Sequence, residues 1–174
     1  MSLIRDMREL HPAVIPVASE WLRRCASRLY PVLIVETRRT WEVQQAYFAR
    51  GRKSIEDVNE LYVRAGLPPI TSDDNLRIIT KAQPPRSFHF FGLAIDFVPF
   101  VDGKPDWIYD ESNPKDFHDD IAKEATNLGF EWGGDWRTFK DLPHIQFTGG
   151  WTIDDAVDWS MRHAHEWRIP IPKR

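Results

Sequence analysis

The chain has 174 residues, of which 42% are hydrophobic and 28% charged, with a formal net charge of −3. This length suits one domain with a buried core. The nearly balanced charge argues against a nucleic-acid partner, and no stretch approaches the ~20 apolar residues of a membrane span. The single cysteine, Cys25, excludes an intramolecular disulfide. Its apolar helical surroundings predict a buried, unreactive thiol.

Helical patterns dominate the first third of the chain. Residues 16–29 repeat apolar side chains at helical spacing, with Pro16 in the first turn. Thr40 is a suitable N-cap for the next helix. The expected helices of this part cover residues 3–10, 16–29, 40–50 and 54–65.

Short β-rich runs predict strands at residues 32–36, 76–80, 93–97, 130–132 and 145–147. The third run alternates, so Leu93, Ile95 and Phe97 should face the core while Ala94 and Asp96 face the opposite side. Residues 101–104 have the composition of a hairpin turn. One strand is therefore expected to bury its apolar face and to present a carboxylate on the other.

Asn113 and Pro114 have the pattern of a helix start, and that helix should end at Gly129. Residues 151–167 predict a C-terminal helix. The order of elements indicates an α+β fold, a small and mostly antiparallel sheet flanked by helices. We expect one domain over residues 1–174, with a core of about 30–148 against which helices 3–29 and 151–167 pack, and a monomer.

Two of the six histidines stand out because each lies at the edge of a predicted strand, close to a carboxylate. His89 precedes Asp96, and His144 follows Asp141. A catalytic zinc site commonly has three protein ligands and an open position, and His89, Asp96 and His144 meet that count. The alternative is a structural histidine beside a surface aspartate. The other four, which lack convergent partners in the sequence, are not expected to be ligands: His11, His118 (on a solvated helix face), His163 and His165.

Asp141 lies three residues before His144, close enough to reach a metal-bound water without ligating the metal. A carboxylate at that place can take a proton from such a water, whose acidity the metal raises. The spacing therefore predicts a general base next to the candidate zinc site.

The pattern Ser87-x-His89-x-x-Gly92-x-Ala94-x-Asp96, followed by Asp141-x-x-His144, resembles the zinc signature of the D-alanyl-D-alanine metallopeptidase group. That group is related to lysostaphin-type enzymes and to the hedgehog domain. Within it, the chain is most similar to the L-alanyl-D-glutamate peptidases of phage endolysins and to VanY-like bacterial enzymes. The similarity covers about residues 30–148 and includes the segments 37–40, 49–52, 79–82 and 132–136.

The resemblance implies Zn²⁺ held by His89, Asp96 and His144, with Asp141 as the general base. Arg39 matches the arginine that stabilises the oxyanion or holds the substrate, and the neighbouring Arg38 stays an alternative. The same resemblance places the expected substrate contacts at Ser87, Arg38, Trp132 and Asp135, although Trp132 is also a candidate for packing at the rim. Arg39 has the alternative of a surface ion pair with Glu36 or Glu42.

The resemblance further implies a peptidoglycan peptidase that hydrolyses the stem peptide, foremost at the L-alanyl–D-glutamate bond. The alternatives are a D,D-carboxypeptidase or dipeptidase, and a zinc-containing module that binds without catalysis. The segment 54–72 is longer than the family pattern, and 83–86 departs from its usual turn. No secretory signal peptide is visible. We therefore expect synthesis in the cytoplasm and action on the bacterial wall after release through a holin-like route.

Overall fold

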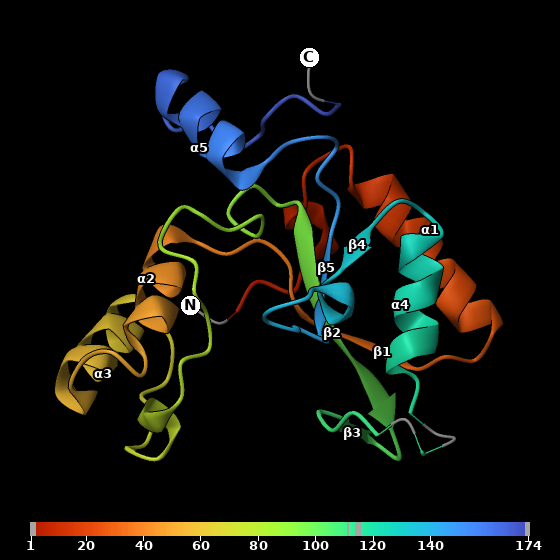
Figure 1. Cartoon of the computed structure of the whole chain (residues 1–174), viewed down its shortest axis with the longest axis horizontal. Coiled ribbons are helices and arrows are strands. Elements are labelled where there is room, and N and C mark those ends of the chain that lie inside the picture. The colour runs from red at the N-terminus through yellow and green to blue at the C-terminus, as the bar shows by residue number, and fades with distance from the viewer. Residues whose placement is uncertain (1–2, 111, 114–115, 173–174) are drawn as a thin grey trace.

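The computed structural model describes residues 3–110, 112–113 and 116–172. Its sheet is antiparallel throughout, in the order β1-β2-β5-β4, with β3 paired to β2 (Figure 1). The strands are β1 (Val32–Glu36), β2 (Ala94–Val101), β3 (Lys104–Pro105), β4 (Glu131–Trp132) and β5 (His144–Gln146). The expected α+β class is confirmed. In the described ranges, no helix is long and apolar enough to span a membrane.

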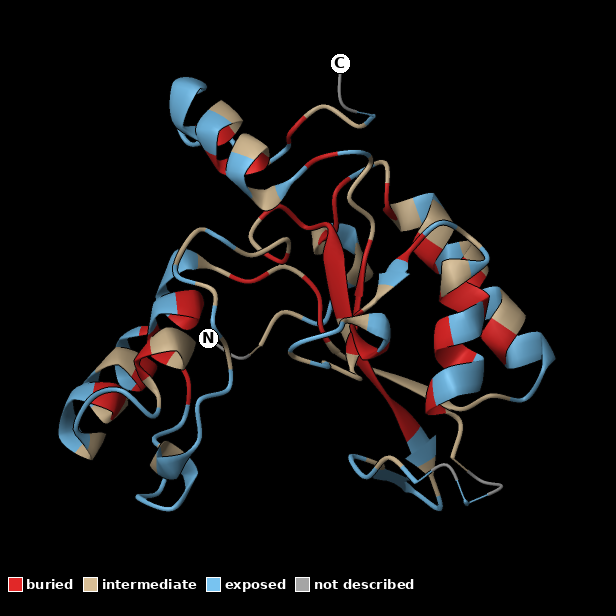
Figure 2. Cartoon of the chain, in the orientation of Figure 1, coloured by how far each residue is buried: buried red, intermediate tan, exposed pale blue. Residues whose placement is uncertain are grey.

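One face of the sheet carries the main core. Leu93, Ile95 and Phe97 are fully buried there, as the alternation of this strand predicts, and they pack against α1 (Ile15–Ser27) and α4 (His118–Thr126) (Figures 1 and 2). Trp21 of α1 meets Phe97 edge to face and donates its indole hydrogen to the carbonyl of Ile121. Cys25 belongs to the same core, and burial followed by the Glu124 carboxylate raises the pKa of its thiol to about 12.

Helices α2 (Trp41–Ala49) and α3 (Ile55–Arg64) form a separate apolar cluster on the other side of the molecule (Figure 1). Thr40 caps α2 by accepting a hydrogen bond from the amide of Val43, as predicted, and Ser54 caps α3. Gly51 follows α2 with a φ of +73°, a conformation that disfavours any side chain. This helical pair therefore lies apart from the main core and faces the sheet.

The two ends of the chain join the main core. The expected helix over residues 3–10 is only a 3-10 turn, Met7–Glu9, capped by the Asp6 carboxylate. The C-terminal helix α5 is Ile153–Arg162 rather than 151–167. It stops there because His163 Nδ1 bonds the carbonyl of Trp159 and the backbone of His165 is left-handed, with a φ of +63°.

Two further predictions of local structure are wrong. Residues 76–80 make no strand; Leu76 and Ile78 are exposed, and the carbonyl of Thr80 is bonded by the Arg52 side chain instead of a neighbouring strand. Helix α4 begins at His118, not at Asn113, and Pro114 lies outside the described residues. His118 is buried and paired with Asp116, where a solvated face was expected.

Candidate metal centre and its cleft

Strand register brings the carboxylates and one histidine together on the sheet face opposite the main core. Asp96 on β2 pairs with Glu36 on β1 and with His144 on β5. Side chains of directly opposed residues share a face of the sheet. Three neighbouring strands thus place Glu36, Asp96 and His144 in one row.

His89 reaches this row from the turn that precedes β2. The turn closes at Gly92, whose φ is +65° and whose carbonyl accepts a hydrogen bond from the amide of His11. A Cβ added at Gly92 would lie 2.8 Å from that same nitrogen, so the close approach requires glycine. This glycine permits the bend that aims His89 at Asp96.

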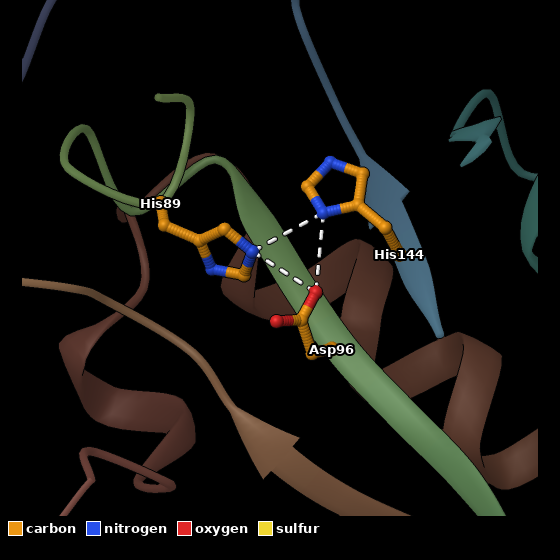
Figure 3. A group of neighbouring side chains, drawn as sticks. All are labelled: His89, Asp96 and His144. Carbon is orange, nitrogen blue, oxygen red and sulfur yellow. Dashed lines mark hydrogen bonds and ion pairs between the residues drawn. The ribbon is translucent and has the colours of Figure 1, made fainter. Parts of the chain in front are cut away.

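The three side chains converge on one point (Figure 3). Nε2 of His89 is 3.0 Å from Oδ1 of Asp96 and 3.2 Å from Nδ1 of His144, and the last two atoms are 3.1 Å apart. A tetrahedral zinc with bonds of about 2.0–2.1 Å sets its ligand atoms about 3.3 Å apart. The observed triangle fits such an ion.

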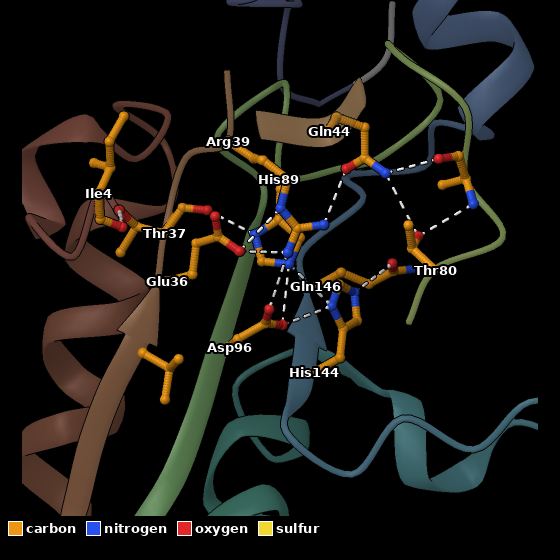
Figure 4. A network of polar contacts seen from close by, with 12 residues as sticks. Ile4, Glu36, Thr37, Arg39, Gln44, Thr80, His89, Asp96, His144 and Gln146 are labelled. Atoms are coloured by element: carbon orange, nitrogen blue, oxygen red, sulfur yellow. Dashed lines mark hydrogen bonds and ion pairs between the residues drawn. The ribbon is translucent and has the colours of Figure 1, made fainter. Parts of the chain in front are cut away.

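The outer nitrogens of both imidazoles face carbonyl-type oxygens (Figure 4). His89 Nδ1 lies 2.6 Å from the main-chain oxygen of Thr37, and His144 Nε2 lies 3.1 Å from Oε1 of Gln146. Such oxygens only accept, so these nitrogens carry the protons and the inner nitrogens keep their lone pairs. With Asp96 they make three acceptors that face one another, an arrangement that calls for a cation.

A second strand pair fixes the orientation of the Gln146 amide. Gln146 on β5 is opposite Glu131 on β4, and its Nε2 donates to Glu131 Oε2 at 2.8 Å. The other oxygen of Glu131 accepts from the Thr148 hydroxyl at 3.0 Å. Because the amide nitrogen is held by Glu131, its oxygen must face His144. The chain from Glu131 through Gln146 to His144 was not anticipated from the sequence.

Arg39 lines the cleft but is itself buried. Its guanidinium donates to Oε2 of Glu36, to Oε1 of Gln44 at 3.0 Å and to Oδ2 of Asp96 at 3.1 Å. Burial opposes its charge, yet Glu36 and Asp96 raise the pKa of Arg39. The alternative of an ion pair with Glu36 is therefore present, although it is buried rather than on the surface, and it holds Asp96 in place.

The charges within the ligand group support one another. Although burial disfavours its charged form, the imidazoles of His89 and His144 hold the pKa of Asp96 well below its usual range. Burial likewise disfavours a charged His144, but the charge of Asp96 and a hydrogen bond from a protonated inner nitrogen raise the pKa of that imidazole. A metal ion bound here would take the place of that proton. Asp96 is thus an anion in this site, as a metal ligand must be.

Asp141 also lines the cleft. Burial and then the nearby charge of Asp96 raise the pKa of its carboxyl. Its main chain is held by Gly133, whose carbonyl accepts from the Asp141 amide at 3.0 Å. A Cβ added at Gly133 would lie 2.4 Å from the Asp141 carbonyl oxygen, so the glycine permits the close approach expected of this loop.

The remaining predicted site residues separate into two groups. Ser87 lines the cleft. The other three are not among the described lining residues: Arg38 bonds Glu9 and stacks over Trp167, Trp132 donates to the carbonyl of Leu142, and Asp135 is exposed. The structure therefore places Arg39, rather than Arg38, beside the candidate metal site.

The cleft has a volume of about 800 Å³ and extends from the sheet to α2 and the segment after α3. Its aromatic lining includes Trp136, whose ring lies 5.2 Å from that of His144. Lys81 reaches across to the Phe139 ring at 4.8 Å. These residues lie on irregular segments, where the sequence has no periodicity to indicate which side chains face inward.

Comparisons with known proteins agree with this site. A family model described as D-alanyl-D-alanine carboxypeptidase, of peptidase family M15, matches residues 80–147. The peptidoglycan L-alanyl-D-glutamate endopeptidase CwlK of Bacillus subtilis is 34% identical over 142 residues, which cover 79% of this chain and 73% of CwlK. The L-alanyl-D-glutamate peptidase of Listeria phage A118 is 48% identical over 67 residues, 38% of this chain but only 22% of the phage protein.

Among solved structures, the L-Ala D-Glu endopeptidase ChiX of Serratia marcescens has 28% sequence identity and a TM-score of 0.49, with 82% of this chain and 83% of ChiX covered. The similarity to CwlK extends well beyond the ligand motifs and covers most of both proteins. The chain therefore belongs to peptidase family M15, the D-alanyl-D-alanine carboxypeptidase family.

Proposed function

We propose that the protein is a zinc-dependent endopeptidase that hydrolyses the L-alanyl–D-glutamate bond of peptidoglycan stem peptides. The observation that carries this proposal is the triangle of three acceptor atoms, from His89, Asp96 and His144, with sides of 3.0–3.2 Å. The bond specificity is supported by the similarity to CwlK and to the phage A118 enzyme, both named for that bond.

When bound by these three atoms, zinc would polarise the peptide carbonyl and lower the pKa of a water toward about 7. Asp141 is the carboxylate that lines the cleft without belonging to the ligand group. In our proposal it takes the proton of the attacking water and delivers it to the leaving amine. Its raised pKa suits a group that must both accept and release a proton.

Arg39 serves this reaction chiefly by positioning. Its donors are directed to Glu36, Gln44 and Asp96, so it fixes the carboxylate that holds the metal. Gln44 in turn donates to the carbonyl of Ala82 at 2.7 Å and so ties the opposite edge of the cleft to the same network. Because Arg39 lines the cleft beside Asp96, its positive charge would also stabilise the negative charge that develops on the substrate carbonyl.

Digestion of purified peptidoglycan by the zinc-loaded protein tests the proposal. We expect new amino termini on D-glutamate, with no release of terminal D-alanine. The Asp141→Asn variant, loaded with zinc in parallel, should leave the wall intact. Absence of new D-glutamate termini with a zinc-loaded wild type would refute the assigned bond.

The second candidate is a D,D-carboxypeptidase, which the description of the matching family model favours. The same digestion distinguishes it, because that enzyme would release free D-alanine from the end of the stem peptide. The third candidate is a zinc-containing module that binds the wall without cutting it. In that case the Asp141→Asn variant would bind the wall as well as the wild type, and neither protein would release any product.

We also propose that the protein acts on the cell wall after leaving the cytoplasm through a holin-like route. Expression in the cytoplasm of a susceptible bacterium should then leave the cells intact until the inner membrane is permeabilised. Loss of turbidity should follow permeabilisation with the wild type, but not with Asp141→Asn. Lysis without permeabilisation would contradict this route.

A further inference from the structure

A second cavity adjoins the cleft on the side of α2 and α3. It has a volume of about 610 Å³, and the two cavities share lining residues that include Arg5, Tyr47 and Arg50. Tyr47 connects it to the metal site, since the Arg39 guanidinium stacks over the Tyr47 ring at 5.0 Å. We call this space, lined by Arg5, Arg50 and Tyr62, the arginine chamber.

Two guanidinium groups in the arginine chamber are each held by a hydrogen bond to a main-chain carbonyl. Arg5 donates through Nε to the carbonyl of Val35 at 3.1 Å, and Arg50 donates through Nε to the carbonyl of Asp74 at 2.7 Å. A neutral carbonyl orients a guanidinium without cancelling its charge. In each side chain Nε is thus already occupied, and a carboxylate ligand would be bound by the two terminal nitrogens, which can make bidentate contacts.

Protein carboxylates make few ion pairs with those terminal nitrogens. Among the described residues, Arg5 has no ion pair, and Arg50 has one long contact of 3.5 Å to Oδ1 of Asp74. The other oxygen of Asp74 is engaged by the amide and hydroxyl of Thr71. Because the Arg50 side chain is only 16% exposed, solvent does little to compensate its charge. Asp74 is the one carboxylate among the described lining residues, so two guanidinium groups, of which Arg5 is exposed, face a single negative charge in the chamber.

A buried hydroxyl in the same chamber also lacks a hydrogen-bond acceptor among the described residues. Tyr62 is 4% exposed and lines the chamber, and within the described ranges its hydroxyl has no hydrogen-bond partner of ordinary geometry. Burial raises the pKa of Tyr62, while the neighbouring Arg50 opposes that shift. Arg50 approaches this oxygen as a donor, and no acceptor is described for the hydrogen of the hydroxyl. The wall of the chamber thus has one donor to spare beside its two cations.

We propose that the arginine chamber is a subsite for a carboxylate of the substrate. This inference rests on the proposed function and deepens it. Glutamate has two carboxyl groups, and since only one can form the next peptide bond, an L-alanyl–D-glutamate substrate whose other carboxyl is not amidated keeps a free carboxylate near the bond that is cut. A short peptide offers a second one at its C-terminus, and an extended residue adds about 3.3–3.6 Å of reach.

Three forms of the tripeptide L-Ala-γ-D-Glu-L-Lys separate these sources: the free acid, the glutamate α-amide and the C-terminal amide. Each is assayed with zinc-loaded wild type and Arg5→Gln. For the free acid we expect Arg5→Gln to raise KM about tenfold, because it removes a charge-assisted hydrogen bond to the substrate carboxylate, with kcat within about twofold. Amidation of the carboxylate that occupies the chamber should weaken the wild type and abolish the difference between the two proteins.

Arg8→Gln is the matched control, because Arg8 lies on the same N-terminal segment, is 89% exposed and lines neither cavity. It should behave as the wild type on all three peptides. Tyr62→Phe adds an independent test that keeps the fold. It should raise KM for the free acid, while Tm stays the same or rises because an unpaired hydroxyl is removed.

Equal cleavage of all three peptides by the wild type, with no selective effect of Arg5→Gln, would overturn the subsite and leave the endopeptidase function intact. If the wild type cleaves none of them, the proposed function is overturned instead. Binding of the uncleaved peptides, followed by calorimetry, then decides the subsite. Weaker binding of one amide by the wild type supports it, and equal binding of all three contradicts it.

Discussion

The two walls of the cleft are built differently. The wall formed by β1, β2, β5 and β4, with the turn before β2 and the loop between β4 and β5, holds its chemical groups on strands or next to them. Strand register sets Asp96 beside His144 and Glu36. The wall formed by α2, α3 and residues 66–82 presents its groups from helix ends and irregular segments, tied down by arginine side chains. The first wall is suited to hold a metal ion rigidly, and the second is suited to recognise the substrate. Changes to the first should therefore abolish metal binding and chemistry, whereas changes to the second should alter substrate affinity.

His89→Ala should have the largest effect, because it removes one of the three proposed ligands from the strand wall. We expect zinc content to fall far below one ion per chain and activity to fall by more than about a hundredfold, the upper effect of losing an outer partner of a metal ligand. Metal analysis after dialysis measures the first and peptide cleavage the second. His163→Ala on the exposed end of α5 is the control and should keep its zinc.

Asp141→Asn should separate metal binding from chemistry on the same wall. The amide cannot accept a proton, so the rate of peptide cleavage should fall about 10²–10⁴-fold while zinc content stays near one ion per chain. Equal losses of zinc and activity would show that Asp141 acts as a ligand or a structural residue, and would remove it from the role of base.

Glu131→Gln tests the outermost group of the strand wall. Without the carboxylate, the Gln146 amide is free to turn its nitrogen toward His144, which then loses the partner that fixes its tautomer. We expect zinc affinity to fall about 10–100-fold, measured by competition with a chelator. Glu60→Gln, at an exposed glutamate of α3 paired with Arg64, is the matched control and should leave zinc affinity unchanged. An unchanged zinc affinity in Glu131→Gln would mean that Gln146 holds its orientation without help.

A pair of glycine substitutions compares the two walls directly and should give the smallest effects, about 1–3 kcal/mol of stability each. Gly133→Ala crowds the carbonyl of Asp141, and should lower kcat with zinc retained. Gly51→Ala crowds the backbone of Ile78 and must also adopt a positive φ, so it should raise KM with kcat little changed. If both substitutions lower kcat alike, the assignment of chemistry to one wall and of substrate affinity to the other is wrong.

The sequence predicted the strand wall better than the helical one. The alternation in residues 93–97 showed which side chains face the core, and the Asp96 side chain follows from it. The motif also led us to expect that His89, Asp96 and His144 lie together, as they do, with Asp141 close to them. These features depend on local pattern, which a sequence displays directly.

What the sequence could not predict depends on contacts between distant segments. Glu131, Gln146 and the carbonyl of Thr37 act through cross-strand register and through a main-chain atom, which has no signature in residue identity. Residues 76–80 have the composition of a strand, yet no strand among the described residues pairs with them, and the Arg52 side chain bonds the carbonyl of Thr80. Arg39 and Arg38 differ by one position, and only the fold shows which of them faces Asp96.

The central claim is that His89, Asp96 and His144 hold one zinc ion. The most direct measurement is an anomalous difference map from crystals of the zinc-loaded protein, recorded on both sides of the zinc absorption edge. We predict one strong peak within about 2.0–2.2 Å of His89 Nε2, Asp96 Oδ1 and His144 Nδ1, present only above the edge. A map without a peak between these atoms, or with the zinc bound at other residues, would contradict the account.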